Sequence, residues 1–234
     1  VYEHVQWASP TAPYVTVAFP SPAFGESSRE SAAMSVLSGL YFGHTSALYK
    51  RLVLTEQKVD LLEVNVPASV DPSLITVYAR VKKAEDAVSV RDQILATVAA
   101  ARASLVPAGA LTDAKAHDRY AFARTFDSTE RIAAVVARYA SYRRSYATVN
   151  TYYRTMDAVT ALDVQAAARK YFSDAGLIVT TLSKDPLPEA MSRTPAIASL
   201  TPAQAFAAAS DPGAAPVERL PAGSPSATLA KVVV

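Results

Sequence analysis

The 234-residue sequence contains no cysteine, so disulfide bonds and thiolate zinc sites are both excluded. Its three histidines, His4, His44 and His117, lie far apart, and none belongs to a paired motif such as H-E-x-x-H or H-x-x-E-H. A lone histidine cannot complete a zinc site, which needs three or four ligands. We interpret His44 as a turn residue, and His117 with Asp113 as a surface pair on a helix. The sequence therefore predicts no metal site on this chain.

Motifs for other catalytic and binding chemistry are also missing. There is no G-x-S-x-G nucleophile motif, no G-x-G-x-x-G dinucleotide motif and no G-x-x-x-x-G-K-[ST] phosphate loop. The 23 Lys and Arg residues nearly balance the 21 Asp and Glu residues without forming a basic run, so no nucleic-acid partner is expected. No stretch reaches the roughly 18 consecutive apolar residues of a membrane span. The sequence thus predicts no catalytic residue, no substrate-binding residue and no membrane span.

What is present is typical of a folded domain, with half of the residues hydrophobic and 19% charged. Residues 14–19, 60–66 and 74–82 alternate apolar with polar side chains, which predicts strands. The last two are expected to pair in antiparallel fashion, with one face on helices and the other toward solvent. The short apolar run 177–182 predicts a buried strand.

Two helices are expected between the first two of these strands. Ser27 or Ser28 is predicted to cap the first helix. Gly43 is expected to end it by adopting a positive φ angle, as a C-terminal glycine often does. A short helix is then predicted over residues 45–55.

From residue 84 onward the sequence is mainly helical. One amphipathic stripe is formed by Val90, Ile94, Val98, Ala101 and Leu105. Pro107 and Gly109 are expected to end that helix. Further helices are predicted over 112–126, 148–159 and 160–172. Another is predicted after a capping box at 127–130, with Ile132, Val135, Val136 and Tyr139 at helical spacing, and the helix at 160–172 is expected to be capped by Thr160 with Asp163.

The composition changes after residue 184, because eight of the fifteen prolines fall within residues 184–234. We predict a domain over residues 1–184 and a Pro- and Ala-rich linker or tail over residues 185–234. A helix over 201–209 is the one element expected there. The apolar end of the tail, residues 229–234, resembles the start of a strand in a further domain.

Tyrosines are concentrated late in the chain, at Tyr139, Tyr142, Tyr146, Tyr152 and Tyr153. They recur with valine and isoleucine at helical spacing, so we interpret them as edges of the core whose hydroxyl groups reach the surface. Such clusters also occur at ligand sites and interfaces.

Two motifs carry a resemblance to a known family. After the turn at Gly43, the helix start is Ser46-Ala-Leu-Tyr-Lys-Arg-Leu52, and a later helix opens with Val159-Thr-Ala-Leu-Asp-Val164. Together with the order of elements over roughly residues 14–182, they resemble the second, non-zinc-binding domain of the pitrilysin/insulinase family of zinc metallopeptidases. That family includes the mitochondrial processing peptidases and their core-protein relatives.

The resemblance implies an α+β fold, with a mostly antiparallel sheet and a layer of helices packed on one face. In the family, an H-x-x-E-H motif and a distant glutamate bind zinc on the first domain, and two halves close around an unfolded peptide. Zinc is therefore expected on a first domain or a partner chain. The parent protein is expected to be a hydrolase active in proteolysis. This chain alone would be an inactive scaffold domain in the wall of the peptide-binding chamber.

One departure from the family concerns substrate contacts. The partner half of the family often supplies an arginine and, seven residues later, a tyrosine, and the matching positions here are Val53 and Asp60. Neither side chain has the donors of those residues. The departure fits the second domain of the zinc-bearing half of a longer peptidase. It also fits a stand-alone degenerate subunit that pairs with a separate zinc-bearing chain.

An unrelated enzyme with a tyrosine or aspartate site is a third hypothesis, but no convergent acid–base pair is readable. The chain begins at Val1 and shows no signal peptide, so we expect a processed or excised piece. For a chain that resembles this family, the alanine-rich, cysteine-free composition suggests a location in a bacterial periplasm or cell envelope.

Overall fold

The computed structural model describes residues 1–124, 128–143, 145 and 147–206 of the chain. Within them, five strands form one sheet in the order β1-β5-β2-β4-β3. The strands are β1 (Tyr2–Gln6), β2 (Tyr14–Ser21), β3 (Val59–Asn65), β4 (Ser73–Val81) and β5 (Ile178–Ser183). β1 runs parallel to β5, and the other pairings are antiparallel. The predicted α+β fold with a mostly antiparallel sheet is confirmed.

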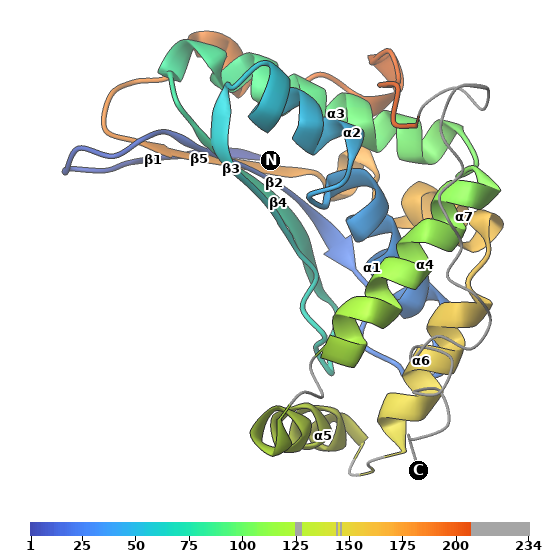
Figure 1. Cartoon of the computed structure of the whole chain (residues 1–234). Helices are drawn as coiled ribbons and strands as arrows, with labels where there is room; N and C mark the ends of the chain where they lie inside the picture. The colour runs from blue at the N-terminus through green and yellow to red at the C-terminus, as the bar shows by residue number, and fades with distance from the viewer. Residues whose placement is uncertain (125–127, 144, 146, 207–234) are drawn as a thin grey trace.

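Helices cover one face of this sheet, and no helix of the described residues covers the other (Figure 1). The α-helices are α1 (Arg29–Phe42), α2 (Ala47–Tyr49), α3 (Ala87–Ala103), α4 (Ala108–Ala123), α5 (Thr129–Arg143), α6 (Thr148–Ala158) and α7 (Ala161–Tyr171). The shorter turns are the π-helix η1 (Lys50–Thr55) and the 3-10 helices η2 (Ala84–Asp86), η4 (Asp174–Gly176), η5 (Glu189–Ser192) and η6 (Ile197–Ser199).

The core lies between the sheet and the helices, where the alternation of the strands predicts it. On β2 and β4 the residues facing the helices are at most 3% exposed, namely Val15, Val17, Phe19, Ile75, Val77, Ala79 and Val81. The predicted stripe of α3 is buried from Val90 to Ala101, but Leu105 lies beyond the helix and is 50% exposed.

Strand β1 has only a weak alternation in sequence, and no strand was predicted there. It pairs with β5, from Tyr2 opposite Val179 to Gln6 opposite Ser183. Because the partner strand lies near the other end of the chain, local periodicity carries little information about this pairing.

The boundary between α3 and α4 differs from the prediction. α3 ends at Ala103 and α4 begins at Ala108, so Gly109 lies inside α4 and does not end the preceding helix. Pro107 is the residue that starts α4, since its fixed φ of −57° and missing N–H group suit a helix start. The helix predicted over 112–126 therefore begins four residues earlier.

Gly43 ends α1 as predicted, but the reason is different. Its φ and ψ angles of −69° and 171° are ordinary extended values, so the expected positive φ is wrong. A Cβ atom at this position would lie 2.5 Å from the carbonyl oxygen of Gly39. Glycine is required here by this close approach of the backbone.

The short helix predicted over residues 45–55 is two different helices. Ser46 Oγ accepts a hydrogen bond from Tyr49 N at 3.1 Å and so starts α2, which continues directly into the π-helix η1. Gln57, which follows η1, has a φ of 51°, the only positive value among the described non-glycine residues. This segment carries backbone strain that apolar spacing does not predict.

The predicted helix caps are mostly observed. Ser28 Oγ accepts from Ser31 N at 3.2 Å, and Thr160 forms a reciprocal capping box with Asp163. Of the cap expected at 127–130, Asp127 lies outside the described residues, and Ser128 Oγ accepts from Arg131 N at 3.3 Å.

Residues 187–206, which we call the strap, run across the outer side of α3. Met191 and Ile197 are each 1% exposed and belong to the main core. Residues 201–206 are not helical, so the helix predicted over 201–209 is wrong in that part, and its last three residues lie outside the described range. Ala203 N instead donates to Ala96 O of α3 at 3.0 Å. The division of the chain at residue 185 stays a prediction.

Candidate functional site

The uncovered face of the sheet is the candidate site, and we call it the open face. Its side chains alternate with the buried ones along each strand and point away from the helices. They include Tyr14 and Thr16 on β2, Thr76, Tyr78 and Arg80 on β4, Leu61 and Glu63 on β3, and Thr180 and Leu182 on β5. The surface is therefore rich in hydroxyl groups and contains both charge signs.

Arg80 and Asp60 form a bidentate ion pair at the β3 edge of this face. The guanidinium Nε and Nη2 atoms lie 2.8 and 3.0 Å from the two carboxylate oxygens. Asp60 sits at an irregularity in the β3–β4 register, between Val59 and Leu61. Hydrogen bonds from Arg80 hold the pKa of Asp60 below its usual range. Asp60 is therefore a charged partner of Arg80 at neutral pH.

Tyr78 and Glu63 form a second cross-strand pair on the same face. They stand directly opposite each other, and the phenol donates to Glu63 Oε2 at 2.5 Å. This hydrogen bond raises the pKa of Tyr78. The carboxylates of Asp60 and Glu63 are thus both hydrogen-bonded to side chains of the neighbouring strand.

The two positions singled out by the family resemblance lie on neighbouring elements, η1 and β3. Val53 is on η1 and packs partly buried against the core. Asp60 is on the adjoining edge strand, where its carboxylate accepts both hydrogen bonds from Arg80. Neither side chain offers a donor for a peptide backbone.

The three histidines lie on separate elements. His4 on β1 is hydrogen-bonded through Nδ1 to Thr181 Oγ1 at 2.9 Å, His44 stacks on Tyr49 with ring centres 4.8 Å apart, and His117 is on α4. Within the described ranges, no group of three or more His, Asp or Glu side chains is placed to hold a metal ion.

The tyrosine cluster packs inside the helical layer. Tyr139 and Tyr152 meet Phe24, with ring centres 6.0 and 5.3 Å away, and Tyr153 stacks on Phe122 at 3.8 Å. The Tyr152 hydroxyl does not reach the surface as expected, because it is hydrogen-bonded to Ser35 Oγ at 3.0 Å. Burial raises the pKa of Tyr152 to about 12. The side chains of Tyr142 and Tyr146 lie outside the described part.

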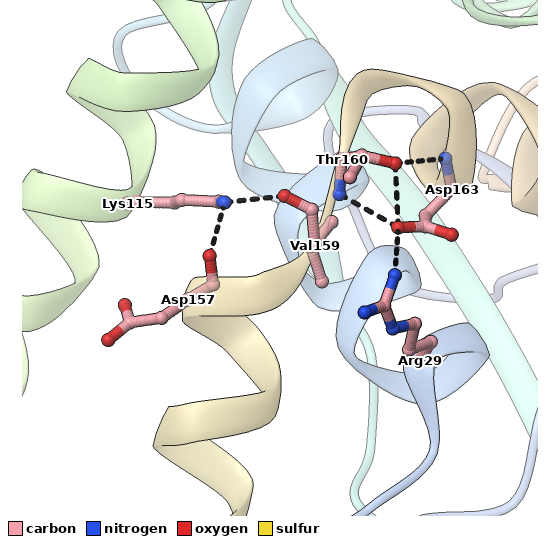
Figure 2. Close-up of polar contacts among 6 residues, drawn as sticks. All are labelled: Arg29, Lys115, Asp157, Val159, Thr160 and Asp163. Carbon is pink, nitrogen blue, oxygen red and sulfur yellow. Dashed lines mark hydrogen bonds and ion pairs between the residues drawn. The ribbon is translucent and has the colours of Figure 1, made fainter.

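A polar cluster on the helical side joins four helices (Figure 2). Lys115 Nζ on α4 donates to the backbone oxygens of Asp157, at 2.7 Å, and Val159 at the end of α6. The next helix begins at the capping box of Thr160 and Asp163, and Asp163 also pairs with Arg29 of α1 at 3.4 Å. Burial lowers the pKa of Lys115. Its ammonium group is committed to helix packing.

No single helix in the described part of the chain is long and apolar enough to cross a membrane. The pair Ala84–Ala103 and Ala108–Ala123 passes the same test of length and composition only when taken together, and it is bent by 112° at the break.

Solved structures share this fold. A protease from Helicobacter pylori has a TM-score of 0.70 at 18% identity, over 78% of this chain and 43% of that one. The peptidase M16 inactive domain from Pseudomonas fluorescens has a TM-score of 0.64 at 13% identity, over 80% and 44%. The inactive peptidase domain of a candidate zinc protease from Bordetella parapertussis has a TM-score of 0.64 at 16% identity, over 79% and 97%.

The fold predicted from the sequence motifs is thus confirmed as that of M16-like peptidase domains, including domains described as inactive. This chain spans less than half the length of the Helicobacter protease that it matches. No protein-family model matches the sequence, and no curated protein matches it.

Proposed function

We propose that this chain is a non-catalytic scaffold domain of a pitrilysin-like zinc metalloendopeptidase. Its role would be to form part of the wall of the peptide-binding chamber and to carry contacts with the other domains. The observation that carries the proposal is a match in fold to peptidase domains described as inactive, in a chain whose open face holds paired rather than free ionisable groups.

The chemistry of the open face supports a role in contact rather than catalysis. An antiparallel sheet can bury one face in its own core and leave the other face free for solvent or for another domain. The hydroxyl groups on the open face can donate and accept hydrogen bonds with either. The zinc, the water that it activates and the general base would then be supplied by a first domain or a partner chain.

The first test uses the isolated chain. Metal analysis after incubation with zinc should find less than stoichiometric metal, and no cleavage of an unfolded peptide should be detected. One bound zinc per chain, or peptide cleavage that a chelator abolishes, would sink the proposal.

A stand-alone degenerate subunit is the second candidate, favoured by Val53 and Asp60 at the positions where the family often has substrate-holding residues. The two candidates are distinguished by the size of the natural polypeptide, detected with an antibody against this chain on a denaturing gel of source-cell extract. A polypeptide far larger than 24.8 kDa supports a domain of one long peptidase. A polypeptide of 24.8 kDa that co-purifies with a separate zinc-bearing chain supports the subunit.

A further inference from the structure

The strap is held by an arginine that is almost completely buried. Arg91 on α3 has a side chain only 3% exposed. Its Nη1 atom donates to the backbone oxygens of Ala190 and Met191, both at 2.9 Å, and its Nε donates to Asp92 at 2.9 Å. A buried guanidinium is tolerated only when its donors are satisfied, so the strap and Arg91 depend on each other.

Further contacts hold the rest of the strap. Ile197 N donates to Asp174 Oδ1 at 2.7 Å, and Ala203 N to Ala96 O at 3.0 Å. The ring of Phe206 meets the edge of Tyr41 with centres 5.2 Å apart. These contacts, with Met191 and Ile197 buried in the core, join the strap to η4, α3 and α1, but the hydrogen bonds among them are few for twenty residues of chain. Segments held by few hydrogen bonds open more readily than a core sheet.

The end of the strap lies against the strained segment of the fold. Residues 203–205 line a small cavity together with Leu48 of α2, Arg51 of η1 and Thr97 of α3. The segment behind them is the α2–η1 turn, which contains the π-helix and leads to Gln57 with its positive φ. A π-helix and a left-handed residue in close succession persist only where surrounding contacts hold them.

This segment also determines where strand β3 begins. Lys58 N donates to Leu52 O at 3.0 Å, so the end of η1 is tied directly to the start of the strand. Asp60, which pairs with Arg80 on the open face, follows two residues later. A change in the α2–η1 turn is therefore coupled by the backbone to the β3 edge of the open face.

We propose that the strap is a conformational lock: docked on α3 through Arg91, it holds the strained α2–η1 turn, and its release loosens that turn together with the β3 edge of the open face. The device is a two-state element, with the strap either docked or open. It links the outer side of the helical layer to the opposite face of the sheet.

Hydrogen–deuterium exchange of the whole chain tests the lock. The variant Arg91→Met has a long apolar side chain in place of the guanidinium and so loses the hydrogen bonds to the strap. We expect its amide exchange to rise about tenfold or more in residues 187–206 and in residues 47–60. Exchange in β2 and β4 should stay as slow as in the unmodified chain. The matched control is Arg193→Met, because Arg193 is in the strap itself but has a side chain that is 78% exposed and pairs with the exposed Glu189. The control should change neither region.

Two results would overturn the lock. In one, the strap exchanges faster in Arg91→Met while residues 47–60 remain protected, which would make the strap a passive cover. In the other, the strap is no faster than in the unmodified chain. If Arg91→Met also speeds exchange in the sheet, the variant Phe206→Ala decides between the two readings, since it removes only the ring contact with Tyr41 at the C-terminal end of the strap. Faster exchange at 47–60 in Phe206→Ala supports the lock, and unchanged exchange contradicts it.

Discussion

Asp118 on α4 is a half-buried carboxylate to which no hydrogen bond or ion pair is made within the described residues. It lines a small cavity with Lys115, Arg119 and Tyr153. Burial raises the pKa of Asp118, because the charged form loses its hydration. The folded chain therefore holds a proton on Asp118 more tightly than the unfolded chain does, and ionisation of this group at neutral pH destabilises the fold.

Replacing Asp118 by asparagine removes that charge while keeping the shape. We expect Asp118→Asn to raise the free energy of unfolding at pH 7 by on the order of 1 kcal/mol, the usual size for relief of an unsatisfied buried group. The gain should shrink as pH falls through the raised pKa toward the ordinary carboxyl range near 4, where the native aspartate is itself protonated. Denaturant unfolding at several pH values measures this.

Asp113→Asn is the matched control, because Asp113 is exposed on the same helix, and its stability should be unchanged. Equal stability of Asp118→Asn and the native chain at pH 7 would contradict the account of this residue.

Among single residues, the sequence predicts those whose role is local. The capping box of Thr160 and Asp163 needs only a spacing of three residues, and it was found. The buried role of Arg91 was not predicted, because Arg91 lies in an ordinary helical pattern. Its partners, Ala190 and Met191, are about a hundred residues away in the chain. Long-range burial of a charged residue leaves no local signal.

At the scale of elements, two glycines near helix ends have opposite roles. A Cβ atom on Gly43 would meet the carbonyl oxygen of Gly39 at 2.5 Å, whereas nothing lies within 4 Å of one on Gly109 inside α4. Gly43→Ala should therefore lower the free energy of unfolding by about 1–3 kcal/mol, the range for forced overpacking. Gly109→Ala should raise it by about 0.5 kcal/mol, since alanine favours helix.

Denaturant unfolding of the two glycine variants beside the native chain measures both effects. Unchanged or higher stability of Gly43→Ala would show that the close approach at Gly43 is not what requires glycine there, and lower stability of Gly109→Ala would contradict the prediction for that position.

Strands with a clean period of two were predicted well, because burial of one face is a property of the strand itself. The π-helix η1 and the strand β1 were not. A π-helix such as η1 has i→i+5 hydrogen bonds, and its apolar spacing is too close to that of an α-helix for the sequence to distinguish the two. The non-helical course of residues 201–206 was also missed, because their backbone is bonded to α3 rather than to itself.

At the scale of the whole molecule, two motifs together with the order of elements gave the family resemblance that predicts the fold, and solved peptidase domains confirm that fold. The candidate site was predicted only in part. Alternation indicated that one sheet face would stay free of helices, but the pairs Arg80 with Asp60 and Tyr78 with Glu63 depend on strand register. Register is set by tertiary contacts and turn geometry, which a single sequence does not state.

If the proposed function is right, other domains or a partner chain enclose the open face in the complete protein. Because the chain has no cysteine, one introduced cysteine reports on one place. Thr76→Cys lies on the open face and Ala116→Cys, the control, is exposed on α4. Each is labelled with a maleimide carried on a polymer too large to enter a closed chamber, in the isolated chain and in the complete natural protein.

With an enclosed open face, both cysteines react in the isolated chain, and only the one at position 116 reacts at the same rate in the complete protein. Labelling at position 76 that is equally fast in the isolated chain and in the complete protein would contradict an enclosed open face.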